Sequence, residues 1–457
     1  MEDRREERPN IIFILSDDQG PWAMGCAGNR EIRTPNLDRL AASGTRFSNF
    51  FCASPVCSPS RATYLTGRMP SQHGIHDWLR GGNVGDDAAQ YLRGEVAYTD
   101  VMARHGYACG ISGKWHMGDS LRPQHGFSHW FVHQKGGGDY NNAPMVRDGR
   151  LTDEPGYVTD VITDDALRFI ETNREKLFYL SVHYTAPHAP WTGHPAEIVK
   201  SYDDCPFESC PQEKRHPNAI SLTDKCLGNR EMLKGYFAAV TAMDAAIGRI
   251  IDRVERLGLR SRTLIVFASD NGFSCGHHGF WGKGNGTLPL NMYENSIKVP
   301  LIFSHTGRVA EGRVEDAMFS GYDFMPTLLD YSDLPLPEGR NLPGISFMPA
   351  LEGNKISCRE SVIVYDEYGP VRMARTKDWK YVQRHPDGPN ELFCLREDPN
   401  ERRDLIADPA YAGRIREMRG LIEDWFARHV VPEMDGLKQA VNGGGQERPV
   451  WKSAGKE

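Results

Sequence analysis

The sequence predicts an α/β protein: a large, mostly parallel or mixed β-sheet sandwiched by helices, followed by a smaller C-terminal subdomain of antiparallel β-sheet and helix. The first observation is that short apolar runs alternate with longer amphipathic stretches, an order that favours a doubly wound sheet. The second is a change near residue 356 to short alternating strands separated by turns. The expected organisation is an α/β domain over 1–355, a sheet-and-helix subdomain over 356–435 and a tail over 436–457.

The composition excludes several classes of function. The 457 residues carry a formal charge of -7, which gives no basis for binding nucleic acid or an anionic membrane. The apolar run after the charged start is too short for a signal peptide, and no stretch approaches about 18 apolar residues, so we expect a cytoplasmic protein unless a leader has been removed. The 10 cysteines show no C-x-x-C pair or zinc-like spacing, and free thiols are expected in a reducing compartment.

The N-terminal region begins with a strand and two short helices. Pro9 to Leu15 is rich in Ile and bounded by charge, which predicts a fully buried strand that runs directly into Asp17 and Asp18. A helix is expected from Pro35, with a threonine cap before it and a stop at Gly44. A second helix, over roughly 58–66, has a proline in its first turn and ends before a glycine.

The middle of the chain continues this alternation. We expect helices over 91–105, 157–173 and 230–257, and strands over 107–112, 178–184, 263–268 and 299–303. The longest of these helices is marked by apolar residues that step by three and four from Tyr236 to Leu257. Residues 192–228 lack such periodicity and form a long excursion, which is a candidate rim or lid.

The C-terminal region has a different pattern. Four short strands with turns between them are expected at SVIVYDEY (361–368), VRMART (371–376), WKYVQ (379–383) and NELFCL (390–395). A helix over about 410–428 closes this small sheet. The tail after residue 436 is Gly-rich and polar, so we expect it to be partly disordered unless Trp451 docks on the folded part.

Polar side chains gather at the ends of the predicted strands, where open α/β sheets bind their ligands. These residues are Asp17, Asp18, Lys114, His116, His188, Asp270 and Asn271. Each alone has a structural explanation, such as a helix cap, a solvated turn or a structural histidine. Their joint placement predicts a functional site.

The residue types at this site indicate its chemistry. The oxygen donors Asp17, Asp18, Asp270 and Asn271 are the kind that a hard cation such as Ca²⁺ or Mg²⁺ prefers over Zn²⁺. Positive charge is added by Arg61, Lys114 and Lys283. A cation surrounded by basic side chains suits a tetrahedral oxyanion, so the residues predict metal-assisted hydrolysis of a sulfate or phosphate ester.

Cys57 begins the helix expected over 58–66. Taken alone, such a cysteine is a small buried hydrophobe. However, Cys57-Ser58-Pro59-Ser60-Arg61 followed by Leu65-Thr66-Gly67-Arg68 matches the C-x-P-S-R-x-x-x-L-T-G signature. The chain therefore resembles the formylglycine-dependent sulfatases, the arylsulfatase-like members of the alkaline phosphatase superfamily. Further matching segments are PNIIFILSDDQG, GKWHMG, APHAPW, ASDNGFSCGHHGFWGK and YDFMPTLLD.

This resemblance implies a catalytic domain over 1–355 and a modified residue at its centre. A formylglycine-generating maturation enzyme would oxidise Cys57 to Cα-formylglycine. Ca²⁺, with Mg²⁺ as the alternative cation, would be held by residue 57 and by the oxygen donors Asp17, Asp18, Asp270 and Asn271. The hydrated aldehyde, a geminal diol, would then attack the sulfur of a sulfate monoester.

The resemblance also implies a role for each basic residue. Arg61 helps to keep the attacking hydroxyl ionised, and Lys114 and Lys283 neutralise charge on the sulfate oxygens. His188 protonates the leaving alcohol. His116 removes the proton from the second hydroxyl, which expels sulfate and restores the aldehyde.

Four further residues are candidates for contact with substrate. Asp77 and Trp78 follow the motif helix and suit sugar recognition, although a buried Trp with a capping Asp is the alternative. His277 and His278 precede Lys283 and either touch the substrate or orient their loop.

The expected substrate is a sulfated small molecule or oligosaccharide, with sulfated carbohydrate as the default. One alternative is a phosphonate or phosphate mono/diester hydrolase of the same superfamily. Another is a catalytically silent binding protein whose Cys57 is never modified. The sequence leaves open whether the protein forms a homo-oligomer. The excursion over 192–228 and the tail are candidate contact elements.

Overall fold

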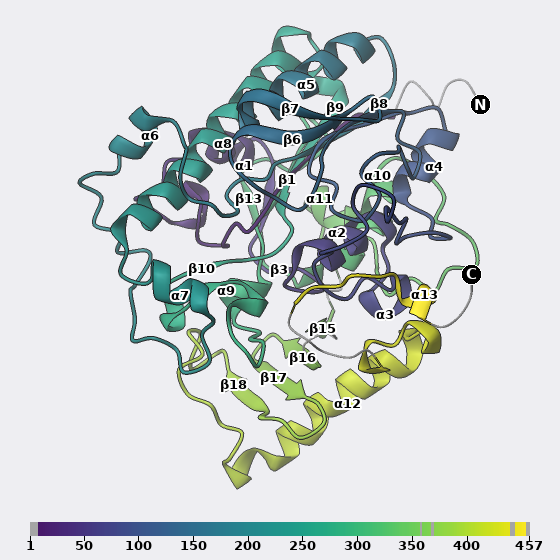
Figure 1. The fold of residues 1–457 in the computed structure, drawn as a ribbon. Helices are drawn as coiled ribbons and strands as arrows, with labels where there is room; N and C mark the ends of the chain where they lie inside the picture. The colour runs from purple at the N-terminus through teal and green to yellow at the C-terminus, as the bar shows by residue number, and fades with distance from the viewer. Residues whose placement is uncertain (1–7, 357–358, 367–369, 439–443, 454–457) are drawn as a thin grey trace.

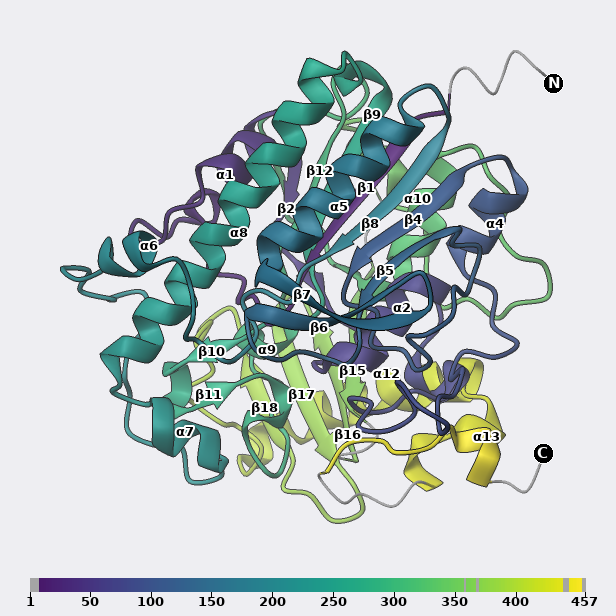
Figure 2. The same ribbon diagram turned by 45° about the horizontal axis from the view of Figure 1, so that its top comes forward.

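The computed structural model describes residues 8–356, 359–366, 370–438 and 444–453. A ten-stranded mixed sheet forms its centre (Figures 1 and 2). In spatial order the strands are β13 (Arg313–Glu315), β2 (Thr45–Phe47), β12 (Leu301–Ser304), β9 (Thr263–Ser269), β1 (Asn10–Ser16), β8 (Phe178–His183), β4 (Ala108–Gly113), β5 (His129–His133), β6 (Asn141–Arg147) and β7 (Arg150–Tyr157). The strands β9, β1, β8, β4 and β5 are parallel, so their carboxyl ends meet at one edge.

Helices cover both faces of the sheet because its central strands are apolar on both sides. In β1, Ile12 and Ile14 pack in the core beneath one layer, and Ile11, Phe13 and Leu15 pack in the core of the other. The first layer contains α1 (Pro35–Ala42), α5 (Val158–Asn173) and α8 (Arg230–Arg256). The second contains α2 (Cys57–Thr66), α4 (Tyr98–Arg104) and α10 (Phe324–Tyr331). The predicted α/β sandwich is confirmed.

The small C-terminal sheet is also confirmed. It is antiparallel and consists of β15 (Ser361–Asp366), β16 (Val371–Thr376), β17 (Trp379–Arg384) and β18 (Glu391–Cys394). The helix α12 (Ala412–His429) packs on it through Met418, Ile422 and Trp425. The last two residues expected in the first of these strands, 367 and 368, lie outside the described residues.

Several expectations differ from the structure. The helix expected over 91–105 begins only at Tyr98, because the chain before it turns at Gly94, whose φ of 87° favours glycine. The antiparallel strands β6 and β7, which extend the sheet, were not predicted from the sequence. The excursion over 192–228 is present and contains the short helices α6 (Ala196–Lys200) and α7 (Ser221–Cys226).

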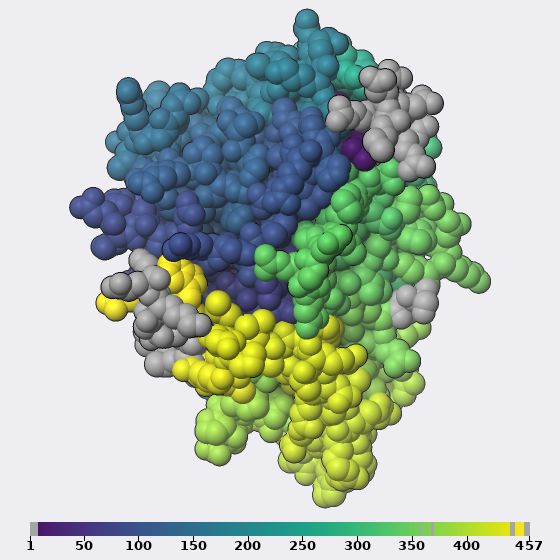
Figure 3. All heavy atoms as spheres, turned by 90° about the vertical axis from the view of Figure 1, so that its right-hand side faces the viewer, coloured from purple at the N-terminus to yellow at the C-terminus, as the bar shows by residue number. Residues whose placement is uncertain are grey.

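The described residues of the tail, 436–438 and 444–453, pack against the rest of the chain. Within the tail, Gln446 forms a β-bridge with Leu79, and α13 (Val450–Ser453) follows. Trp451 docks on the folded part of the chain. The guanidinium carbon of Arg93 lies 5.9 Å from the centroid of the Trp451 ring. Figure 3 shows the C-terminal residues, in yellow, packed against the blue N-terminal third of the chain. Among the described residues, each helix is too short or too polar to cross a membrane.

A buried ion cluster joins the small sheet to the main domain. Lys380 on β17 is 0% exposed, and its Nζ lies 2.5 Å from Glu401 Oε1 and 2.7 Å from Glu294 Oε1. The same amine donates to the carbonyl oxygen of Met292 at 2.8 Å. Because Glu294 and Met292 belong to the main domain, this lysine fixes the small sheet to the loop that precedes β12.

We therefore predict that Lys380→Met lowers the free energy of unfolding by about 3–5 kcal/mol, because it removes the cation that pairs with buried Glu401 and leaves Glu294 with Arg375 and Lys298 alone. The measurement is denaturant-induced unfolding followed by circular dichroism. Arg396→Met is the control, since its ion pair with Asp378 is exposed and 3.6 Å long, and it should change stability by less than about 0.5 kcal/mol. Equal effects of the two variants would contradict the prediction.

Candidate active site

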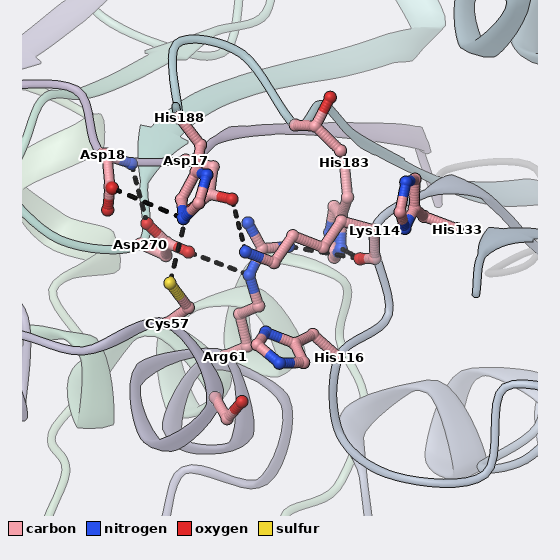
Figure 4. A network of polar contacts seen from close by, with 12 residues as sticks. Asp17, Asp18, Cys57, Arg61, Lys114, His116, His133, His183, His188 and Asp270 are labelled. Atoms are coloured by element: carbon pink, nitrogen blue, oxygen red, sulfur yellow. Dashed lines mark hydrogen bonds and ion pairs between the residues drawn. The ribbon is translucent and has the colours of Figure 1, made fainter. Parts of the chain in front are cut away.

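The carboxyl ends of the parallel strands bring the predicted residues together (Figure 4). Asp17 and Asp18 follow β1, while Asp270 and Asn271 follow the adjacent β9. Lys114 and His116 follow β4, and His188 lies beyond the end of β8. The helix α2 points its N-terminus at this edge, so that Cys57 and Arg61 join the cluster. These residues are far apart in the sequence, and the parallel strands bring them together at one edge of the sheet.

Acidic and basic side chains alternate in this cluster. Lys114 Nζ donates to Asp17 Oδ2, and Arg61 Nε donates to Asp270 Oδ2 at 2.8 Å. Lys283 Nζ donates to Asp18 Oδ1 at 2.5 Å. All six side chains are at most 8% exposed, so each charge depends on its partner.

Cys57 lies between an acid and a base. Its Sγ is 3.3 Å from Asp17 Oδ1 and 2.7 Å from Lys283 Nζ. Burial and the negative charge of Asp17 raise the pKa of the Cys57 thiol to about 12, so the side chain is a neutral thiol near pH 7. A reactive cysteine needs the opposite shift, because the thiolate is its nucleophilic form. The unmodified Cys57 is therefore poorly suited to act as a nucleophile.

The acidic residues fit a hard divalent cation. Ligand oxygens of Asp17, Asp18 and Asp270 all lie within 4.8 Å of one another. Asn271 Oδ1 is buried without a hydrogen-bond partner, while its Nδ2 donates to Asp18 Oδ1 at 2.7 Å. Burial would raise the pKa of Asp17, but Lys114 and neighbouring cations hold it well below its ordinary value, so it stays ionised. Burial and the charge of Asp17 raise the pKa of Asp270 to about 7, a shift that a bound cation would oppose. Carboxylates and an unpaired amide oxygen are the donor set that Ca²⁺ prefers.

The two histidines are oriented by backbone carbonyls. His116 Nε2 donates to the Leu79 carbonyl oxygen at 3.1 Å, which leaves Nδ1 as the unprotonated nitrogen, and this atom is buried without a partner. Burial lowers the pKa of His116 well below its ordinary value, so it is a neutral base. His188 Nδ1 donates to the Ala189 carbonyl oxygen at 2.7 Å, and its Nε2 lies 3.8 Å from Asp18 Oδ2.

A cavity of about 710 Å³ opens above this cluster. Its lining includes Cys57, His116, His188 and Lys283, and also the predicted contact residues Asp77 and Trp78. A loop of three glycines, 136–138, lies against the histidines, because a Cβ on Gly136 would come within 2.2 Å of the His116 ring. The cavity therefore gives a substrate direct access to the reactive groups.

His277 and His278 are not among the residues that line this cavity. His277 Nε2 bonds the Ser209 carbonyl oxygen at 3.0 Å, and the His278 ring stacks on Tyr293 with 3.9 Å between centroids. Their contact with substrate stays a prediction. The structure favours the alternative, in which they orient the loop that leads to Lys283.

Comparison with known proteins places the chain in a family. A family model described as Sulfatase matches residues 9–334, and a model described as N-sulphoglucosamine sulphohydrolase, C-terminal, matches residues 276–427. Arylsulfatase A of Homo sapiens is 30% identical over 448 residues, covering 88% of this chain and 84% of the relative. The chain belongs to the sulfatase family. It is a sulfuric ester hydrolase.

Bacterial relatives resemble this sulfatase over most of its length. N-acetylglucosamine-6-O-sulfatase of Bacteroides thetaiotaomicron is 27% identical, covering 92% of this chain and 86% of the relative. A solved structure of a protein in complex with its substrate D-glucosamine-2-N,6-O-disulfate superposes with a TM-score of 0.79 at 25% identity, covering 94% of this chain and all of the other. The predicted membership and fold are thus confirmed, whereas the roles of single residues stay predictions.

The C-terminal tail contributes a residue that the sequence did not indicate. Gln446 of this sulfatase is 3% exposed, and its Oε1 accepts from His76 N at 2.8 Å while its Nε2 donates to the Gly74 carbonyl oxygen at 3.0 Å. Its backbone bonds Trp78 and Arg80. The segment that it holds, 74–80, includes the Leu79 carbonyl that orients His116. A single glutamine in a polar tail has no local pattern that would reveal this contact.

We predict that Gln446→Ala lowers kcat of the active sulfatase by about tenfold. The substitution leaves buried backbone groups of segment 74–80 without partners, at a cost of about 1–3 kcal/mol, and so loosens the carbonyl that orients His116. The measurement is sulfate release at saturating substrate. Glu433→Ala, an exposed change in the same C-terminal region, is the control and should retain the wild-type kcat. An unchanged kcat in Gln446→Ala would contradict the assignment.

Proposed function

We propose that this sulfatase removes sulfate from a sulfated carbohydrate, with residue 57 in the formylglycine form and Ca²⁺ in the acidic cluster. The observation that carries the proposal is the position of Cys57, which touches both Asp17 and Lys283 at the N-terminus of α2. An oxygen nucleophile at this point would lie beside the cation ligands and at the floor of the substrate cavity.

The chemistry of sulfur supports the modified residue. The Cys57 thiol is neutral in its surroundings, and attack by a thiolate would leave a stable thiosulfate ester on the enzyme. Formylglycine supplies a hydrated aldehyde, whose hydroxyl is a nucleophile and whose sulfate ester decomposes by elimination. Arg61 and Lys283 provide positive charge on either side of this position.

The cation would be held by Asp17, Asp18, Asp270 and Asn271, whose donor atoms are those described above. When bound, Ca²⁺ supplies Lewis acidity that stabilises negative charge on the reacting oxygens. Lys114 and Lys283 would balance the charge of the four donors and of the incoming sulfate.

The two histidines divide the proton transfers. His188 lines the cavity and its Nδ1 donates to the Ala189 carbonyl oxygen, so Nε2 carries a hydrogen only in the imidazolium form, and that form would protonate the departing alcohol. His116 is neutral, with its unprotonated Nδ1 available to accept the proton from the hydroxyl that remains on residue 57. The two side chains therefore suit an acid and a base.

Relatives support the choice of carbohydrate. Besides the glucosamine derivatives named above, N-acetylgalactosamine-6-sulfatase of Canis lupus familiaris is 30% identical over 383 residues, covering 77% of this chain and 67% of the relative. Asp77 and Trp78 line the cavity, where a carboxylate and an aromatic ring suit the hydroxyls and the apolar face of a sugar. A phosphonate monoester hydrolase of Agrobacterium radiobacter shares the fold at 19% identity, so comparative rates on paired sulfate and phosphonate esters separate this alternative.

We expect Cys57→Ala to abolish sulfate release while leaving circular dichroism and the melting temperature close to those of the wild type. The reason is that the change removes the nucleophilic position but only a small part of the core. Peptide mass across residue 57 of the active wild type should show the aldehyde in place of the thiol. Retained turnover in Cys57→Ala, or full activity with an intact thiol, would overturn the proposal.

Calcium should bind the folded protein and stabilise it. At a concentration 100 times its dissociation constant, a ligand that binds only the folded state adds about 2.7 kcal/mol, which raises the melting temperature. Asp18→Ala should lose this rise, whereas Asp252→Ala, which changes an exposed carboxylate on α8, should keep it. A rise of equal size in Asp18→Ala would show that Ca²⁺ binds elsewhere.

A further inference from the structure

Two large apolar side chains are exposed inside the active-site cavity. Leu288 is 61% exposed and Ile220 is 36% exposed, and both line the cavity above Lys283. Leu222 and Leu290 line it beside them. Exposed aliphatic side chains that gather at one place commonly mark a surface that a ligand covers. We call these four residues the apolar wall.

Two segments distant in sequence build this wall and pair with each other. Ile220 N donates to the Gly286 carbonyl oxygen at 3.1 Å, and Leu288 N donates to the Asn218 carbonyl oxygen at 2.8 Å. An antiparallel β-bridge joins Ala219 to Thr287 between these two bonds. The excursion over 192–228 is thus fixed to the loop that follows Lys283, which agrees with its predicted role as a rim.

Side chains beneath the wall hold it in place. Asn291 Nδ2 donates to the carbonyl oxygens of Lys283 at 3.0 Å and Gly284 at 3.1 Å. Thr287 Oγ1 donates to the Pro289 carbonyl oxygen at 2.8 Å. Because Asn291 is 2% exposed and Thr287 is 1% exposed, the wall rests on buried contacts. Leu288 is therefore part of an ordered surface, and the same loop contains Lys283 at the cavity floor.

Charged residues also line the cavity outside the cluster at the floor. They are Asp77, Arg80, Lys135 and Asp366. Asp77 and Asp366 are buried, and burial raises the pKa of Asp77 to about 7, whereas Arg80 and Lys135 are exposed. The four residues of the apolar wall add no charge to this lining, so the part of the cavity that they form suits an uncharged group.

We infer that the apolar wall is a binding subsite for an uncharged apolar group, alkyl, aryl or acyl, carried by the alcohol of the sulfate ester. The inference rests on the proposed function, because it requires the sulfate at the cavity floor. From that floor, a substituent on the alcohol extends along the loop after Lys283 and covers Ile220 and Leu288. The subsite favours sulfate esters that carry an apolar substituent over those that lack one.

A homologous series of alkyl sulfates tests this inference directly. Ethyl, butyl and hexyl sulfate each place a sulfate at the floor and differ only in how much chain reaches the wall. In the wild type, the inhibition constants against a chromogenic aryl sulfate should fall by about fourfold for each methylene that is buried. In Leu288→Ser this dependence on chain length should flatten. Leu151→Ser, which changes a leucine 53% exposed on β7 away from the cavity, should keep the wild-type dependence.

The possible results of this experiment distinguish failure of the subsite from failure of the proposed function. A dependence on chain length that Leu288→Ser removes and Leu151→Ser retains supports the subsite. Inhibition constants that do not vary with chain length in the wild type, or that vary equally in all three proteins, overturn it. A wild-type protein that carries formylglycine yet releases no sulfate from sulfated sugars or from the aryl ester overturns the proposed function itself.

Discussion

The structure depends on the pairing of three buried carboxylates with three buried cations. Placing Asp17, Asp18 and Asp270 in the interior is costly unless each charge is compensated, and Lys114, Lys283 and Arg61 compensate them one by one. The partners come from five places in the fold, so the cluster is complete only when the ends of β1, β4 and β9, the helix α2 and the loop with Lys283 meet at one edge of the sheet. A bound divalent cation and a sulfate would add opposite charges to this set and leave its balance nearly unchanged.

The regular part of the fold could be predicted because its signals are local. The Ile-rich run of β1 and the three- and four-residue steps of α8 indicate burial without reference to the rest of the chain. The strands β6 and β7 carried no such signal, because β7 is an edge strand whose side chains are largely exposed. The late start of α4 was missed for a related reason, since the apolar residues before Gly94 pack in the core without being helical.

The residues of the candidate site also fall into those that the sequence could predict and those that it could not. Residues at strand ends, such as Asp17 and Lys114, were found because parallel topology converts sequence position into spatial position. The place of His277 and His278 before Lys283 left open whether they touch substrate or orient their loop, and their contacts with Ser209 and Tyr293 favour the second. Gln446 and the apolar wall depend on contacts between segments that are 70 to 370 residues apart, which no local pattern encodes. Family membership accounts for the floor of the cavity, while these long-range contacts shape what lies above it.

The contact of Gln446 with segment 74–80 also sets an order of events during synthesis. Residue 446 leaves the ribosome roughly 390 residues after Cys57, which at ordinary elongation rates is a delay of roughly 20–80 s. During this interval the cysteine is translated but the segment beside it lacks its last hydrogen-bond partner. In the folded protein Cys57 is 2% exposed at the cavity floor, so a second protein has less access to it than in the open chain. Any enzyme that oxidises this residue therefore has a window in time, before the chain closes over it.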